Sequence, residues 1–143
     1  MNHNLYLDLN IRISAKADKV WDALVNPEKI KLYLYGTKAF SKWKKGSELL
    51  FTGEFQGKHY TDKGIILELE AEKMFSYTYW SGFSGSEDKA ENYSTIVFEL
   101  EKAEDGVVLY LRQLGFASVQ AKEHSEKAWQ SVLQQIKQLV EQG

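Results

Sequence analysis

The chain has 143 residues, and we expect residues 1–143 to form one domain, because domains commonly contain about 100–150 residues. It has no cysteine, which excludes a disulfide framework, a thiolate metal site and a cysteine nucleophile. The 18 basic and 20 acidic residues are mixed along the chain, so the net charge of −2 favours neither nucleic acid nor acidic lipid as a partner. No signal-peptide core is found in residues 1–25, and no apolar run approaches the ~18 residues of a membrane span. We therefore expect a cytoplasmic protein without stable membrane insertion.

The first third of the chain predicts one strand followed by two short helices. Apolar and polar residues alternate over residues 5–13, which is typical of a half-buried strand. Ser14 is suited to cap the helix that follows, whose apolar residues recur at helical spacing over residues 20–25. Pro27 ends this helix and begins the second, because proline disfavours helical geometry in the preceding residue but fits the first turn of a helix. Tyr35-Gly36 ends the second helix.

The middle of the chain predicts six strands. Gln56-Gly57-Lys58 joins two of them as a hairpin, and Gly64 within a strand indicates a bulge or a sharp bend. Residues 81–92 have no periodicity and are rich in glycine and serine, which indicates a mobile loop. The six strands are expected near residues 37–43, 49–55, 60–69, 75–80, 95–100 and 107–115.

A long amphipathic helix is predicted from Ser118 to about Glu141. Its apolar residues fall at the i, i+3, i+4, i+7 spacing of one buried stripe: Trp129, Val132, Leu133, Ile136, Leu139 and Val140. We expect this helix to close the fold against the strands. A helix laid across a curved antiparallel sheet tends to leave a cavity, and cavities of this kind hold ligands.

Common motifs of catalysis and metal binding are missing from the sequence. Residues 82–86 begin like a nucleophile elbow, but Ser86 stands where the second glycine belongs, and the segment lies between two strands. No glycine-rich phosphate loop is present. His3, His59 and His124 do not have metal-ligand spacing. We therefore predict no catalytic residue, no metal and no cofactor.

Several segments resemble the START-like helix-grip superfamily, and within it the branch named after the activator of the ninety-kilodalton heat-shock-protein ATPase. The similar segments are Ile13-Ser14-Ala15, residues 20–24, 57–58, 62–68, 77–81, 91–95 and 123–129, which span nearly the whole chain in the right order. The sequence departs from the pattern at Lys16, where many relatives have proline, and at residues 32–35, where many have paired aromatic residues. The resemblance implies an α+β helix-grip fold. About seven antiparallel strands would curve around the C-terminal helix, with an internal cavity under two short helices that follow strand 1.

On that fold, one set of side chains would point toward the C-terminal helix and enclose the cavity. Tyr60, Tyr77, Tyr79 and Gln113 would bring polar groups into apolar surroundings, where each needs a partner or a water molecule. Trp43 and Trp80 lie near strand ends beside loops and are further candidates. We predict the following ligand-binding residues: Trp43, Tyr60, Tyr77, Tyr79, Trp80, Ile96, Phe98, Leu111, Gln113, Trp129 and Leu133.

Three functions fit these expectations. The first is binding of a small hydrophobic or flat aromatic molecule, polyketide-, flavonoid- or lipid-like, without chemistry. The second is a cyclase or hydrolase for aromatic polyketide-like compounds, which the resemblance to the superfamily allows. The third is a chaperone partner, as the branch name suggests. It is the least favoured, because the resemblance covers only the C-terminal part of the eukaryotic activator and no charged docking stripe is evident. Binding without turnover is the prediction.

Overall fold

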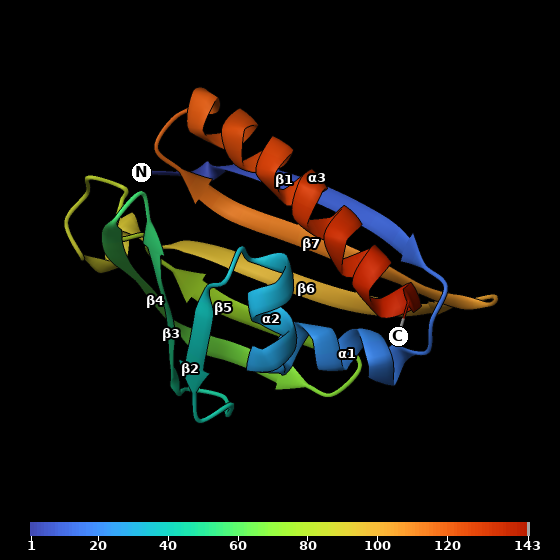
Figure 1. The fold of residues 1–143 in the computed structure, drawn as a ribbon. Helices are drawn as coiled ribbons and strands as arrows, with labels where there is room; N and C mark the ends of the chain where they lie inside the picture. The colour runs from blue at the N-terminus through green and yellow to red at the C-terminus, as the bar shows by residue number, and fades with distance from the viewer. Residues whose placement is uncertain (143) are drawn as a thin grey trace.

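A computed structural model describes residues 1–142 and has the predicted α+β architecture, with a curved sheet, two short helices after the first strand and a long C-terminal helix (Figure 1). The elements in chain order are β1 (Asn2–Ile13), α1 (Ala17–Val25), α2 (Pro27–Tyr33), β2 (Lys38–Ser41), β3 (Glu48–Phe55), β4 (Lys58–Glu70), β5 (Met74–Tyr79), the 3-10 turn η1 (Ala90–Asn92), β6 (Ser94–Ala103), β7 (Gly106–Phe116) and α3 (Val119–Gln142).

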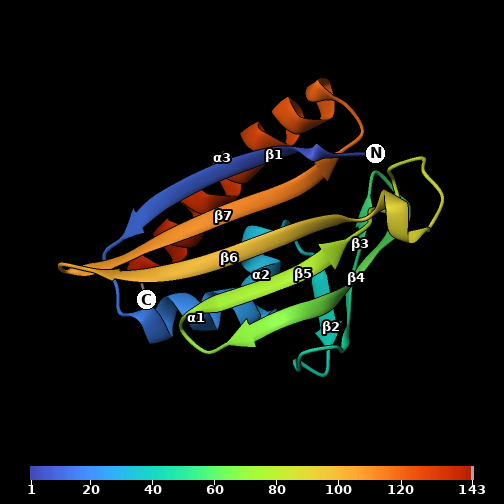
Figure 2. The same cartoon turned by 180° about the vertical axis from the view of Figure 1, so that it is seen from behind.

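The seven strands form one antiparallel sheet in the order β1-β7-β6-β5-β4-β3-β2. Within residues 1–142, the three α-helices cover the same face of this sheet, and none lies on the opposite face, as the view from behind shows (Figure 2). The β3–β4 hairpin and the loop of residues 81–92 lie side by side at one end of the molecule. The core therefore lies between the concave face of the sheet and the helices.

Gly64 stands at a point where the backbones of β4 and β5 approach too closely for a side chain. A Cβ atom at this position would lie 1.6 Å from the carbonyl oxygen of Thr78. The predicted irregularity in this strand is present, but the register shift between β4 and β5 falls between Ile66 and Glu68 rather than at the glycine. Glycine is thus required here by close backbone packing, as it often is inside strands.

The two short helices begin and end largely as predicted, with one correction. Pro27 occupies the first turn of α2, and the Asn26 side chain caps that helix by accepting a hydrogen bond of 3.0 Å from the Glu28 amide. Ser14 does not cap α1, because the helix begins later, after Lys16, whose side chain makes no capping bond. The Ser14 amide instead donates to Glu141 at the far end of the chain.

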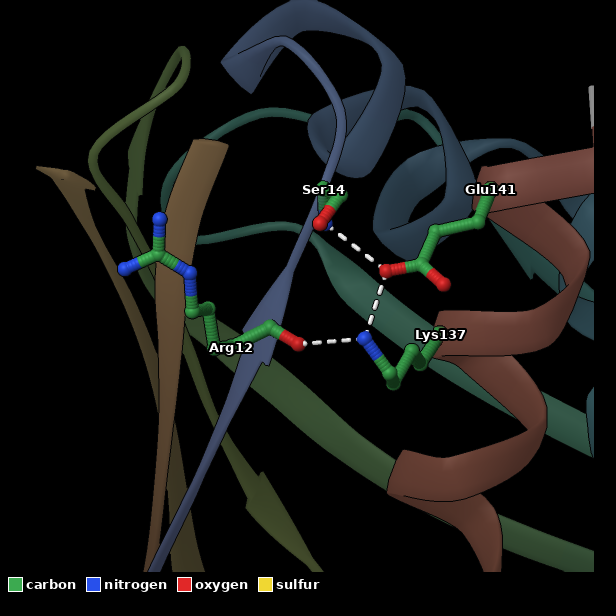
Figure 3. Close-up of polar contacts among 4 residues, drawn as sticks. All are labelled: Arg12, Ser14, Lys137 and Glu141. Atoms are coloured by element: carbon green, nitrogen blue, oxygen red, sulfur yellow. Dashed lines mark hydrogen bonds and ion pairs between the residues drawn. The ribbon is translucent and has the colours of Figure 1, made fainter. Parts of the chain in front are cut away.

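The C-terminal end of α3 is fastened to the end of β1 (Figure 3). Glu141 Oε2 accepts hydrogen bonds from the Ser14 amide at 2.8 Å and from Lys137 Nζ at 2.5 Å. Lys137 Nζ also donates to the Arg12 carbonyl oxygen at 2.9 Å. Beneath this contact, the helix buries Val132, Leu133, Ile136 and Val140 in the core.

Candidate functional site

A cavity of about 590 Å³ lies between the concave face of the sheet, the end of α2 and the first half of α3. The sheet contributes side chains from β3 to β7, and α3 contributes one side of its early turns. The lining residues are Leu34, Tyr35, Thr37, Phe51, Glu54, Phe55, Tyr60, Asp62, Tyr77, Tyr79, Phe83, Ile96, Gln113, His124, Ser125, Ala128, Trp129 and Val132. The lining is mostly apolar with a few polar groups, which is typical of small-molecule sites.

One polar group in the wall is the carboxylate of Asp62 on β4. Its Oδ2 accepts a hydrogen bond from the Tyr79 hydroxyl at 2.6 Å, and its Oδ1 accepts one from the Gly82 amide at 2.9 Å. Burial and the nearby Asp62 carboxylate raise the pKa of Tyr79 well above its usual value, so this tyrosine stays protonated and donates. The arrangement also ties the start of the loop at residues 81–92 to the sheet.

A second polar group connects the sheet to the helix. Trp129 Nε1 on α3 donates to Gln113 Oε1 on β7 at 2.7 Å, and Gln113 Nε2 donates to Ser94 Oγ on β6 at 3.1 Å. Both polar ends of the buried Gln113 side chain are therefore satisfied, as buried amides require. This chain of bonds holds the indole ring against the cavity.

Tyr77 differs from its neighbours because its hydroxyl has no partner among residues 1–142. The residue lines the cavity and is 5% exposed. Within residues 1–142, the polar side-chain atom that is both sealed from solvent and unpaired is Trp80 Nε1. The unpaired Tyr77 oxygen is therefore not sealed, and it is open to the cavity. Burial, followed by the field of Asp62, raises the pKa of Tyr77, which keeps the hydroxyl neutral.

Three exposed aromatic residues from three segments surround the mouth of the cavity. Tyr35 follows α2, Phe55 ends β3 and Phe83 lies in the loop after β5. Phe83 also packs on Tyr60, with ring centroids 5.3 Å apart, and the Tyr60 hydroxyl is 2.6 Å from Thr37 Oγ1. The mouth thus offers flat apolar surface that leads into the interior.

The structure brings six of the predicted site residues together around the cavity and places five elsewhere. Those that line it are Tyr60, Tyr77, Tyr79, Ile96, Gln113 and Trp129. Phe98, Leu111 and Leu133 are buried in the core, and Trp43 packs on Phe75 with centroids 6.1 Å apart. Trp80 lies outside the lining, with Lys63 Nζ 5.8 Å from its ring centroid.

Sequence reasoning missed several lining residues, of which Phe51, Val132, Thr37 and Asp62 are buried. The sequence did contain a signal for Asp62. It is separated from Tyr60 and from the buried Ile66 by even numbers of residues, so the three share one face of β4. The helix residues Ser125 and Ala128 gave no such signal, since they are small or polar and resemble an exposed helix face.

A second hollow of about 640 Å³ lies at the other end of the sheet, around the β1–α1 junction and the β6–β7 turn. Its lining mixes charges of both signs with short side chains, including Lys16, Asp18, Glu72, Lys102 and Asp105. It lies outside the space between the sheet and α3 and contains none of the predicted site residues. The cavity under the first half of α3 is therefore the candidate site.

Metal and membrane features are not found in the part of the chain that the structure describes. No group of three or more histidine and acidic residues within 1–142 is placed to hold a metal ion. No helix there has the length and apolar character needed to cross a membrane.

Comparisons with known proteins agree with this architecture. Residues 14–141 match the family described as Activator of Hsp90 ATPase homolog 1-like protein. The chain is similar to ChR145 from Cytophaga hutchinsonii, with 37% identity, a TM-score of 0.85 and coverage of 99% of this chain and 97% of the other. No match is found among the curated proteins.

Two more distant structures share the fold. The Aha1 dimer from Colwellia psychrerythraea has a TM-score of 0.76 at 17% identity, covering 96% of each chain. CalU16 from Micromonospora echinospora has a TM-score of 0.65 at 17% identity, covering 96% of this chain and 81% of the other. Likeness at this level of identity concerns the fold alone.

Proposed function

Because this chain belongs to the family of Activator of Hsp90 ATPase homolog 1-like proteins, with its helix-grip fold, we propose that it binds a small hydrophobic or flat aromatic molecule in the cavity under α3. The observation that carries the proposal is the open hydroxyl of Tyr77, which lies in an apolar, aromatic cavity of about 590 Å³. An unpaired hydroxyl that opens into an apolar cavity needs a partner, which a ligand or a water molecule would supply. The family is named after an activator of a chaperone ATPase, but the proposal rests on the cavity.

The size of the cavity and its aromatic wall favour a ligand of a few fused rings or a short lipid. Cavities that hold drug-sized molecules commonly measure about 300–1,000 Å³. One wall of the cavity is aromatic and consists of Phe51, Tyr77 and Tyr79. The distance between ring centroids is 5.9 Å for Phe51 and Tyr77 and 6.4 Å for Phe51 and Tyr79. Such a wall suits a flat aromatic surface, because rings pack favourably in offset or edge-to-face arrangements.

The test is a ligand screen by two-dimensional amide NMR on isotope-labelled protein, with mixtures of flavonoid-like, polyketide-like, fatty-acid and sterol-like compounds. We expect saturable shifts of the Tyr77, Tyr79 and Gln113 amides and of the Trp129 indole N–H, since these groups line the cavity. If saturating amounts of every class leave these signals unmoved, the proposal is wrong.

A variant that fills the cavity provides the control. Ala128 lies on α3, lines the cavity and is exposed at the surface, so Ala128→Trp places an indole at the mouth without disturbing the core. Gln134→Trp adds the same side chain at an exposed helix position outside the cavity. We expect the first substitution to reduce affinity at least tenfold and the second to leave it unchanged.

A cyclase or hydrolase remains the second candidate, and the buried Asp62 carboxylate is the observation that favours it. A carboxylate in a partly closed cavity can accept a proton from a bound substrate, provided that the reacting group comes within hydrogen-bond distance. The measurement is turnover of the compounds that bind in the screen. If the natural protein forms product and Asp62→Asn binds the compound without forming product, the protein is an enzyme rather than a binding protein.

A further inference from the structure

The cavity lining carries carboxylates but no lysine or arginine. Asp62 and Glu54 are the acidic residues of the lining, and His124 is its histidine. Glu54 is exposed at the mouth, but Asp62 lies inside and is 9% exposed. Because the effective dielectric constant falls away from bulk water, the charge on Asp62 acts more strongly on a bound molecule than a surface charge would.

Neutral groups hold this carboxylate in place. Its two hydrogen bonds come from the Tyr79 hydroxyl and the Gly82 amide. The next residue along the strand, Lys63, pairs with Asp88 at 2.5 Å, and Asp62 takes part in none of the ion pairs found within residues 1–142. A buried carboxylate without a counter-charge is unfavourable, so a cation delivered by a ligand would be stabilised there.

Asp62 also keeps capacity for further donors. A carboxylate has about four lone-pair sites, of which the two protein bonds use two. Tyr77 lies on the neighbouring strand, lines the same cavity, is 5% exposed and has its hydroxyl free of partners among residues 1–142. Together they offer a charged acceptor and a free hydroxyl to one ligand.

We propose that the cavity selects hydrophobic or aromatic amines, whose ammonium group binds Asp62, over alcohols of the same skeleton, and that it rejects the corresponding carboxylic acids. The selection rests on the proposed binding function and adds the chemical class of the ligand. A fatty acid or an aromatic acid would bring a second negative charge next to Asp62, where no lining lysine or arginine could compensate.

Three naphthalene probes that differ in one group test this selection. They are 2-naphthylmethylamine, 2-naphthylmethanol and 2-naphthoate, titrated at pH 7.5 into the labelled protein while the Trp129 indole and Tyr77 amide signals are followed. We expect the amine to bind at least tenfold more tightly than the acid, with the alcohol between them. Equal affinity for the three probes, or preference for the acid, would overturn the selection but leave the binding function standing. If none of the probes and no compound of the wider screen binds, both proposals are wrong.

The Asp62→Asn substitution tests whether this carboxylate causes the preference for amines over acids. It keeps the size of the side chain and one acceptor, and we expect it to bring the amine and the acid within about threefold of each other. Glu99→Gln removes the same charge from an exposed position on β6 outside the cavity and should leave the tenfold preference intact. If Asp62→Asn does not fold, the order of the three probes on the natural protein still tests the selection of amines over acids. If it folds and the preference persists, Asp62 is not the selecting group.

Discussion

The two halves of α3 differ in what they contact. The C-terminal half buries Val132, Leu133, Ile136 and Val140, and Lys137 and Glu141 fasten it to β1 and to the backbone at Ser14 (Figure 3). The N-terminal half has mostly exposed side chains and covers the cavity with His124, Ser125, Ala128 and Trp129. One helix thus closes the core at one end and covers the candidate site at the other.

The difference between the two halves of α3 explains where the cavity forms. The apolar stripe of α3 begins at Trp129, and the turns before it carry small or polar residues on the side that faces the sheet. The cavity lies between those side chains and the aromatic wall that Phe51, Tyr77 and Tyr79 form on β3 and β5. Stability is therefore concentrated in the second half of the helix, and the first half can vary or move at lower cost.

The largest effect is expected from Ile136→Ala in the packed half. Ile136 is 0% exposed, and its removal should lower the free energy of unfolding by about 2–5 kcal/mol, because transfer free energy is lost and a void remains. Urea unfolding followed by circular dichroism measures this.

Val119→Ala is the matched control, because Val119 is an exposed apolar residue in the first turn of the same helix. Its effect should stay within about 0.5 kcal/mol. If both substitutions cost the same free energy, the two halves do not differ as described.

A smaller effect is expected from Trp129→Phe at the boundary of the two halves. The change removes the indole donor and leaves the buried Gln113 Oε1 without its partner, which should cost about 1–3 kcal/mol. Trp21→Phe is the control, since Trp21 is half-buried and its ring nitrogen makes no hydrogen bond among residues 1–142. Equal losses of unfolding free energy in the two variants would show that ring size, rather than the hydrogen bond, stabilises the boundary.

The smallest effect concerns the pH dependence of the contact at the C-terminal end. Hydrogen bonds from Lys137 and then from the Ser14 amide lower the pKa of Glu141 below its ordinary value of 4.5. A group whose pKa is lower in the folded state stabilises the fold above the unfolded-state pKa, and this contribution is lost as the pH falls through the folded-state pKa. Thermal unfolding of the natural protein should therefore show a small loss of Tm below pH 4.5 that Glu141→Gln lacks. Parallel pH profiles for the two proteins would contradict the role of this contact.

Much of the fold followed from local patterns in the sequence. The alternation in residues 5–13 predicted β1, Pro27 marked the boundary of the two short helices, and the stripe from Trp129 predicted which side of α3 is buried. These features are readable because strand and helix periods depend on neighbouring residues alone. The resemblance to the helix-grip superfamily then implied that Tyr77, Tyr79 and Gln113 point inward from the sheet, and all three line the cavity.

Tertiary structure decided which inner residues fill the core and which line the cavity. Phe98 and Tyr77 both point inward, but Phe98 packs against Trp129 with centroids 5.8 Å apart, and Tyr77 keeps an open hydroxyl. The two bonds to Asp62 and the contact between Glu141 and Ser14 likewise join residues far apart in sequence. The sequence by itself determined the elements and which residues share a face of each element, because both depend on local periodicity. The distance between helix and sheet, which leaves the cavity open, depends on the packing of all these elements together.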